Sequence, residues 1–155
     1  MPVRLGFLGC GGIANHHMAR IKDIAEAQMV AFYDVDAERA AKAAETYGGT
    51  AFDSAEKLCN EGGVDAVYIC TPPFAHGDLE LAAIAAGKPF MVEKPIALTM
   101  ATAREVERAA NAAGLITSVA YHFRYFDATR RAEAALAGQT ITTFLGYWMG
   151  GFPGV

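Results

Sequence analysis

The chain has 155 residues, of which 53% are hydrophobic and 19% are charged, and its formal net charge is −4. This balance supports about one domain with a packed core and excludes wholesale disorder. No block of Lys or Arg could follow a phosphate backbone, so we expect no nucleic-acid partner. No apolar run approaches the roughly 20 residues that cross a bilayer, and the N-terminus lacks a signal-peptide pattern, so we expect no membrane partner.

The three cysteines, Cys10, Cys59 and Cys70, are scattered along the chain without a CxxC spacing. This arrangement indicates neither a disulfide framework nor a zinc site, and we expect no metal site. A reduced, cytoplasmic location is the expected setting.

Short apolar runs alternate with longer, alanine-rich helical stretches through the first 121 residues. Strands are predicted over 3–9, 29–34, 50–52, 64–70, 89–93 and 115–121, and helices over 12–24, 36–48, 54–60, 76–87 and 99–114. The strand segments are continuous apolar runs, as expected when both faces of a sheet are covered. Strands that alternate with helices predict an α/β fold with a doubly wound parallel sheet and right-handed crossovers.

Local signals mark where several of these helices begin and end. Ser54 and Thr99 are suitable N-caps, whereas Gly48, Gly87 and Gly114 are suitable stops.

The character of the chain changes after about Tyr121, where we predict a domain boundary between 1–121 and 122–155. A helix is predicted over 125–138 and an alternating strand over 140–149. Because that strand is apolar on both sides, we expect it to pair with another copy of itself or to pack back on the first domain.

A glycine-rich turn follows the first predicted strand and opens the first predicted helix, with Gly9, Gly11 and Ala14 in the spacing G-x-G-x-x-G/A. The first glycine permits the tight turn, the second lets the backbone approach a pyrophosphate, and the small third residue lets helix and strand pack closely. The start of the helix adds free N–H groups and a positive dipole. The turn therefore predicts dinucleotide binding; the alternative is a Rossmann-like fold that binds another ligand.

An acidic residue closes the second predicted strand, because Asp34 follows Ala14 by twenty residues. A carboxylate here would accept hydrogen bonds from the adenosine ribose and repel a 2′-phosphate, which favours NAD over NADP. Asp36 is a second candidate for the ribose contact, although its position favours a cap of the next helix.

The fourth predicted strand ends in "CTPPFAH", where Thr71 and Pro72 begin a rigid, extended turn. Ligands of open parallel sheets bind beyond such strand ends, so this turn could line a cofactor. His76 is interpreted either as a ligand contact or as a helix-start residue touching solvent. We interpret His16 and His17, inside the first helix, as packing or surface residues.

The fifth predicted strand ends in "VEKP", so Glu93 and Lys94 leave the sheet where the nicotinamide half of a dinucleotide would lie. Pro95 biases Lys94 towards an extended backbone, and the Lys94–Pro95 bond could be cis or trans. A lysine beside a nicotinamide can hydrogen-bond the substrate oxygen and stabilise charge as hydride moves, which favours a catalytic role for Lys94. The alternative is an exposed Glu-Lys pair in a loop.

The segments "GFLGCGGIA", "FYDVDAERA", "CTPPFAH" and "VEKPIALT", in this order, closely resemble the Gfo/Idh/MocA family of sugar and inositol dehydrogenases. The resemblance covers nearly the whole chain, and the EKP element is its most specific mark. It implies an N-terminal Rossmann domain that binds NAD or NADP, and the oxidation or reduction of a sugar, cyclitol or similar polyol.

By this resemblance, Lys94 is the catalytic lysine and also contacts the cofactor, while Glu93 helps to hold the nicotinamide ribose. The resemblance implies further cofactor contacts in the glycine-rich turn, at two strand ends and in the segment "AYHFRY", namely Gly9, Gly11, Gly12, Ile13, Asp34, Thr71, Pro72, His76, His122 and Arg124.

The resemblance therefore implies the cofactor-binding portion of an NAD(H)-dependent oxidoreductase, which we expect to be a homo-oligomer. Family members are longer, and their second half supplies an antiparallel sheet, the substrate pocket and an acid–base histidine. We expect 122–155 to be a linker helix and the first strand of that substrate domain, and the chain to be a fragment that is inactive alone. Two alternatives stay open: a non-catalytic dinucleotide-binding sensor or scaffold, and internal redox chemistry with a tightly held cofactor.

Overall fold

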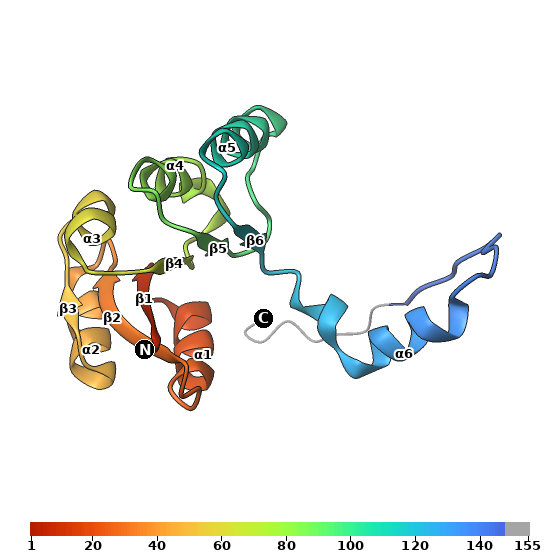
Figure 1. Cartoon of the computed structure of the whole chain (residues 1–155), viewed down its shortest axis with the longest axis horizontal. Helices are drawn as coiled ribbons and strands as arrows, with labels where there is room; N and C mark the ends of the chain where they lie inside the picture. Colours follow the sequence, from red (N-terminus) through yellow and green to blue (C-terminus); the bar gives the residue numbers. More distant parts are fainter. Residues whose placement is uncertain (148–155) are drawn as a thin grey trace. The chain divides into compact units, whose positions relative to one another are not determined.

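The computed structural model describes residues 1–147, and the chain divides into two units, Met1–Tyr121 and His122–Val155. The first unit contains a parallel sheet in the order β3-β2-β1-β4-β5-β6, with helices on both of its faces (Figure 1). Its strands are β1 (Val3–Leu8), β2 (Ala27–Tyr33), β3 (Thr50–Ala51), β4 (Ala66–Ile69), β5 (Phe90–Val92) and β6 (Thr117–Val119). The predicted α/β fold with a doubly wound parallel sheet is confirmed.

The helices of this unit begin and end close to the predicted residues. They are α1 (Gly12–Ile21), α2 (Ala37–Tyr47), α3 (Ala55–Glu61), α4 (Asp78–Ala85) and α5 (Met100–Ala113), with a short 3₁₀ turn, η1 (Pro73–Ala75). Ser54 and Thr99 accept hydrogen bonds from backbone N–H groups three residues on, at 3.1 Å each, so both predicted N-caps are confirmed. The predicted stops Gly48, Gly87 and Gly114 all have positive φ.

The core lies on both faces of the sheet. On one face, Leu8, Val67 and Ile69 belong to a fully buried cluster with residues of α3 and α5. On the other face, Phe7 and Phe32 pack in a cluster with α1 and α2. Burying one such side chain stabilises the fold by about 1.5–3 kcal/mol. Burial on both faces explains why the strand sequences are continuous apolar runs.

The second unit contains the 3₁₀ turn η2 (His122–Tyr125) and the helix α6 (Asp127–Leu136), which confirms a helix within the predicted range 125–138. The strand predicted over 140–149 is wrong for residues 140–147, which form neither helix nor strand. Residues 148 and 149 lie outside the described residues. An alternating pattern describes the faces of a strand, but a strand also needs a neighbour to take up its hydrogen bonds, and 140–147 have no such neighbour among the described residues. Within residues 1–147, no helix is both long and apolar enough to cross a membrane.

Candidate functional site

The carboxyl ends of the four central strands meet at one edge of the sheet. Backbone N–H groups just beyond three of these ends continue the ladder: Gly9 donates to Tyr33, Cys70 to Leu8 and Glu93 to Ile69, at 2.7, 2.7 and 2.9 Å. The strand order reverses between β1 and β4, which is the place where open α/β sheets bind ligands. The fold therefore brings three predicted segments together: the glycine-rich turn, the loop after β4 and the loop after β5.

The glycines of the turn serve two different needs. Gly9 has a φ of 96°, and a Cβ atom there would lie 2.5 Å from the carbonyl oxygen of Cys70, so the fold itself requires glycine. A Cβ atom on Gly11 or Gly12 would meet no described atom within 4 Å. These two glycines therefore border open space, which leaves their backbone accessible to a ligand.

The start of α1 is suited to an anion. Its N-cap, Gly11, has no side chain to accept from the first N–H groups, and the first turn of α1 contains no acidic residue. Ile13, in that turn, is 39% exposed. Free N–H groups and the positive end of the helix dipole favour a phosphate at this position.

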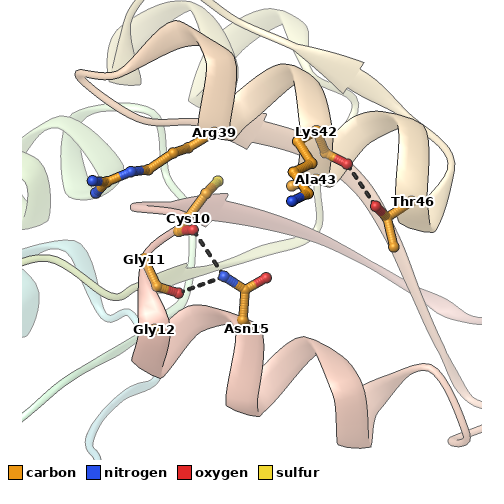
Figure 2. Close-up of a pocket in the computed structure, with 8 residues that line it drawn as sticks. All are labelled: Cys10, Gly11, Gly12, Asn15, Arg39, Lys42, Ala43 and Thr46. Carbon is orange, nitrogen blue, oxygen red and sulfur yellow. Dashed lines mark hydrogen bonds between the residues drawn. The ribbon is translucent and has the colours of Figure 1, made fainter.

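A pocket of about 450 Å³ lies between the glycine-rich turn and α2, and we call it the turn pocket (Figure 2). Its lining residues are Cys10, Gly11, Gly12, Asn15, Arg39, Lys42, Ala43 and Thr46. Asn15 donates from its amide nitrogen to the carbonyl oxygens of Cys10 and Gly11, at 3.1 and 2.9 Å, and so fixes the turn (Figure 2). Arg39 and Lys42 add positive charge. The open glycines, the uncapped helix start and the two cations all fit the phosphates of a dinucleotide.

Asp34 is fixed against the turn. Its Oδ2 accepts from the N–H of Cys10 at 2.7 Å, and its Oδ1 accepts from the N–H of Asp36 at 2.9 Å. Each oxygen keeps a further lone pair for a ligand hydroxyl. Asp36 caps α2 by accepting from the N–H of Glu38 at 3.1 Å, which confirms its role as a cap. Burial, together with the charge of Asp34, raises the pKa of the Cys10 thiol to about 12.

The loop after β4 is tied to the loop after β5 by His76. Its Nε2 lies 3.1 Å from the carbonyl oxygen of Thr71, and its Nδ1 lies 2.8 Å from that of Pro95. The side chain has no exposed surface, so the interpretation as a helix-start residue touching solvent is wrong. The ring is enclosed by the two loops, and a contact of His76 with a cofactor stays a prediction. The hydroxyl of Thr71 is buried and has no hydrogen-bond partner within residues 1–147.

Glu93 and Lys94 differ sharply in exposure. Glu93 is 4% exposed, and its Oε1 lies 2.7 Å from Nε2 of His17 while its Oε2 accepts from the N–H of Lys94 at 3.2 Å. Lys94 is exposed, and the bond between Lys94 and Pro95 is cis. The alternative of an exposed Glu-Lys pair is therefore wrong for Glu93. The interpretation of His17 as a packing or surface residue also misses its contact with this carboxylate.

His122 and Arg124 lie in η2, in the second unit. The ring of His122 contacts those of Phe123 and Phe126, and the guanidinium of Arg124 lies 5.7 Å from the centre of the Tyr125 ring. Their role towards a cofactor stays a prediction.

Sequence reasoning missed Asn15, His17, Arg39 and Lys42. Asn15 and the two cations could have been found, because Asn15 lies one helical turn after Gly11, and the cations lie in the helix that follows Asp34. No local signal links His17 to Glu93, which is 76 positions away.

Comparison with known proteins identifies proteins that are similar to this chain. Residues 3–121 match the model of the Gfo/Idh/MocA family, an oxidoreductase family with an NAD-binding Rossmann fold. A 1,5-anhydro-D-fructose reductase of Ensifer adhaerens is 36% identical over 86% of this chain and 40% of its own length. An inositol 2-dehydrogenase of Paracoccus denitrificans is 34% identical over 89% of this chain and 43% of its own length. The chain thus spans about two fifths of the length of these relatives.

A similar solved structure is the WlbA dehydrogenase of Bordetella pertussis in complex with NADH and UDP-GlcNAcA. It superposes with a TM-score of 0.82 at 25% identity, covering 88% of this chain and 42% of that protein.

Proposed function

Because this chain belongs to the Gfo/Idh/MocA family of oxidoreductases, we propose that it is the cofactor-binding portion of an NAD(H)-dependent enzyme acting on a CH–OH group. The observation that carries the proposal is the Asp34 carboxylate fixed against a glycine-rich turn whose next glycine borders open space. The names of the relatives, a sugar reductase and an inositol dehydrogenase, support a sugar, cyclitol or similar polyol as the substrate.

The residues of the turn have separate roles in this proposal. Gly9 makes the bend, while Gly11, Gly12 and Ile13 offer backbone to the pyrophosphate, beside the positive end of α1. Asp34 accepts from the adenosine ribose hydroxyls. Its charge disfavours a 2′-phosphate, whereas the positive charges of the turn pocket favour any phosphate, so the preference for NAD depends on Asp34.

The nicotinamide half is assigned to the loops after β4 and β5. Thr71 and Pro72 line its path, and Glu93 holds its ribose. A nicotinamide supplies hydride transfer when it is bound. Lys94 is exposed beside the buried Glu93, so its ammonium can donate to the substrate oxygen and stabilise the negative charge that develops there. We expect the proton acceptor to lie outside the described residues.

Calorimetric titration of this chain with NADH and with NADPH tests the cofactor assignment. We expect NADH to bind and NADPH to bind at least about tenfold more weakly, because the Asp34 carboxylate would face the 2′-phosphate. A preference for NADPH would contradict the role of Asp34, and binding of neither would contradict the proposed function.

A Lys94→Ala variant separates cofactor binding from chemistry. We expect its NADH affinity to stay within about threefold of the parent, because the exposed amine is directed to the substrate. In a longer protein that also supplies a substrate domain, the same change should lower kcat by about 10²-fold or more. Turnover at the parent rate would show that Lys94 is not catalytic.

A further inference from the structure

We propose that His17 and His76 are positioning residues that hold the Lys94 segment at its two ends, one through the Glu93 carboxylate and the other through the Pro95 carbonyl. This inference rests on the proposed role of Lys94 and goes beyond it, because neither histidine needs to touch cofactor or substrate.

The Lys94 segment leaves the sheet with little backbone support. The last ladder bonds join Glu93 N–H to Ile69 and Ala120 N–H to Val92, at 2.9 Å each. The next regular element, α5, begins only at Met100. Between these points the lysine is exposed, so its position depends on how its neighbours are held.

His17 holds the N-terminal side of this segment. Glu93 is almost completely buried, and an ionised carboxylate only accepts hydrogen bonds, so Nε2 of His17 is the donor across the 2.7 Å contact. The edge of the His17 ring also meets the ring of Tyr68, with 5.8 Å between centres. His17 lies on α1, the helix whose first turn borders the glycine-rich turn. One helix therefore carries both the expected pyrophosphate contact and the support of Glu93.

Among residues 1–147, loss of the His17 donor would leave the buried carboxylate with one hydrogen bond, from the N–H of Lys94. An unpaired buried carboxylate is energetically costly, so its side chain gains free energy by turning towards another hydrogen-bond donor. The next residue along the chain, Lys94, carries an ammonium on a long, exposed side chain. We therefore expect the freed carboxylate to capture that ammonium, which would withdraw it from the substrate.

His76 holds the C-terminal side. Both of its ring nitrogens face carbonyl oxygens, which only accept, so both bonds form together only when both nitrogens carry protons. Oε1 of the fully buried Glu80 lies 3.8 Å from Nδ1 of His76 and has no hydrogen-bond partner within residues 1–147. Oε2 of Glu80 accepts from the N–H of Gly77, which anchors the pair at the start of α4. His76 therefore fixes Pro95 to the loop that carries Thr71.

The test reads the surroundings of Lys94 directly and needs no cofactor. The five lysines of the chain are converted to ¹³C-dimethyl-lysine, which keeps their charge, and their signals are recorded by NMR. The signal that disappears in Lys94→Arg is that of Lys94. The variants are His17→Ala and His76→Ala. His17→Ala is paired with His17→Gln, whose amide nitrogen lies about where Nε2 lay, and His76→Ala is paired with His76→Asn, whose amide nitrogen lies about where Nδ1 lay and can donate to the Pro95 carbonyl. Circular dichroism confirms that each variant is folded.

We expect the Lys94 signal to move in both Ala variants by more than the spread of the other four lysine signals. In His17→Gln and His76→Asn it should return towards its original position. An unmoved Lys94 signal in the folded Ala variants would overturn the proposal. A moved signal that the folded His17→Gln and His76→Asn variants fail to restore would also overturn it, because restoring the donor does not reverse a purely structural effect of losing the ring. Because these measurements are made without NADH, they remain decisive even if the NADH titration contradicts the proposed function.

Discussion

The Oδ2 atom of Asp34 accepts a hydrogen bond from the backbone N–H of Cys10 at 2.7 Å, which joins the end of β2 to the glycine-rich turn after β1. Its other oxygen accepts from the N–H of Asp36. The carboxylate expected to hold a ribose is therefore also part of the fold, and its removal should affect both binding and stability.

Asp34→Ala should lower the free energy of unfolding by about 1–3 kcal/mol, because two backbone N–H groups lose their acceptor. The affinity for NADH should fall in the same variant. Urea denaturation and calorimetry measure the two effects. Asp36→Asn is the matched control, since Asn caps helices as well as Asp does and the ion pair between Asp36 and Arg39 is exposed. Unchanged NADH binding by Asp34→Ala would contradict its assignment.

Gly9 and Gly11 should respond to substitution in opposite ways. Gly9→Ala places a Cβ atom 2.5 Å from the Cys70 carbonyl oxygen at a φ of 96°, so it should destabilise the fold by about 2 kcal/mol or more. Gly11→Ser meets no described atom within 4 Å and adds a hydroxyl that can cap α1. It should therefore leave stability unchanged or raise it by roughly a few tenths of a kcal/mol.

The same Gly11→Ser variant should bind NADH about tenfold or more weakly. Its side chain takes the space left for the ligand, and its hydroxyl competes for the N–H groups that a phosphate would use. Thermal unfolding and calorimetry on both glycine variants make the comparison. Parent-like NADH affinity in Gly11→Ser would show that the open space at Gly11 is not the pyrophosphate site.

Features encoded within a few residues were predictable from the sequence. Ser54 and Thr99 could be identified as caps because an N-cap and the N–H that it accepts are three residues apart. The glycine-rich turn could be placed because it lies directly between an apolar run and a helix. The doubly wound sheet followed from the alternation of such segments.

Contacts between distant segments were not predictable in the same way. His17 and Glu93 are 76 positions apart, and nothing near either residue indicates the other. His76 resembled a helix-start residue in solvent, because its burial comes from the loops that contain Thr71 and Pro95. Within residues 140–147 the expected strand is absent for a related reason, since local alternation cannot supply the neighbouring strand that a ladder requires.

The three cysteines should be unreactive in the folded protein. All three are buried, and burial raises the pKa of Cys10 and Cys70 to about 12 and that of Cys59 to about 11. Because the thiolate is the nucleophile, iodoacetamide at pH 8 should not label the native chain. The same reagent in denaturant should add three groups, as counted by intact mass. Rapid labelling of one cysteine without denaturant would contradict the buried position of that thiol.

Arg4 and Asp65 should give the stability of the fold a measurable pH dependence. The Asp65 carboxylate accepts from the backbone N–H of Arg4 at 2.8 Å and from its Nε and a terminal guanidinium nitrogen at 3.2 and 2.8 Å. These hydrogen bonds lower the pKa of Asp65 to about 2. A lowered carboxyl pKa contributes stability that is present above the unfolded value, about 3.9, and is lost as the pH falls through the folded value.

The difference in stability between the parent and Asp65→Asn should therefore be constant from pH 7 to about 5 and shrink as the pH falls towards 2. Urea denaturation across the range where both proteins remain folded measures it. Asp53→Asn is a useful control, because it removes an exposed ion pair with Lys57, four residues away, and leaves the sheet untouched. Its difference from the parent should be smaller, since an exposed ion pair between two side chains stabilises a fold little. If the Asp65→Asn difference were the same at pH 7 and pH 3, the hydrogen bonds from Arg4 would not be what stabilises the ionised carboxylate.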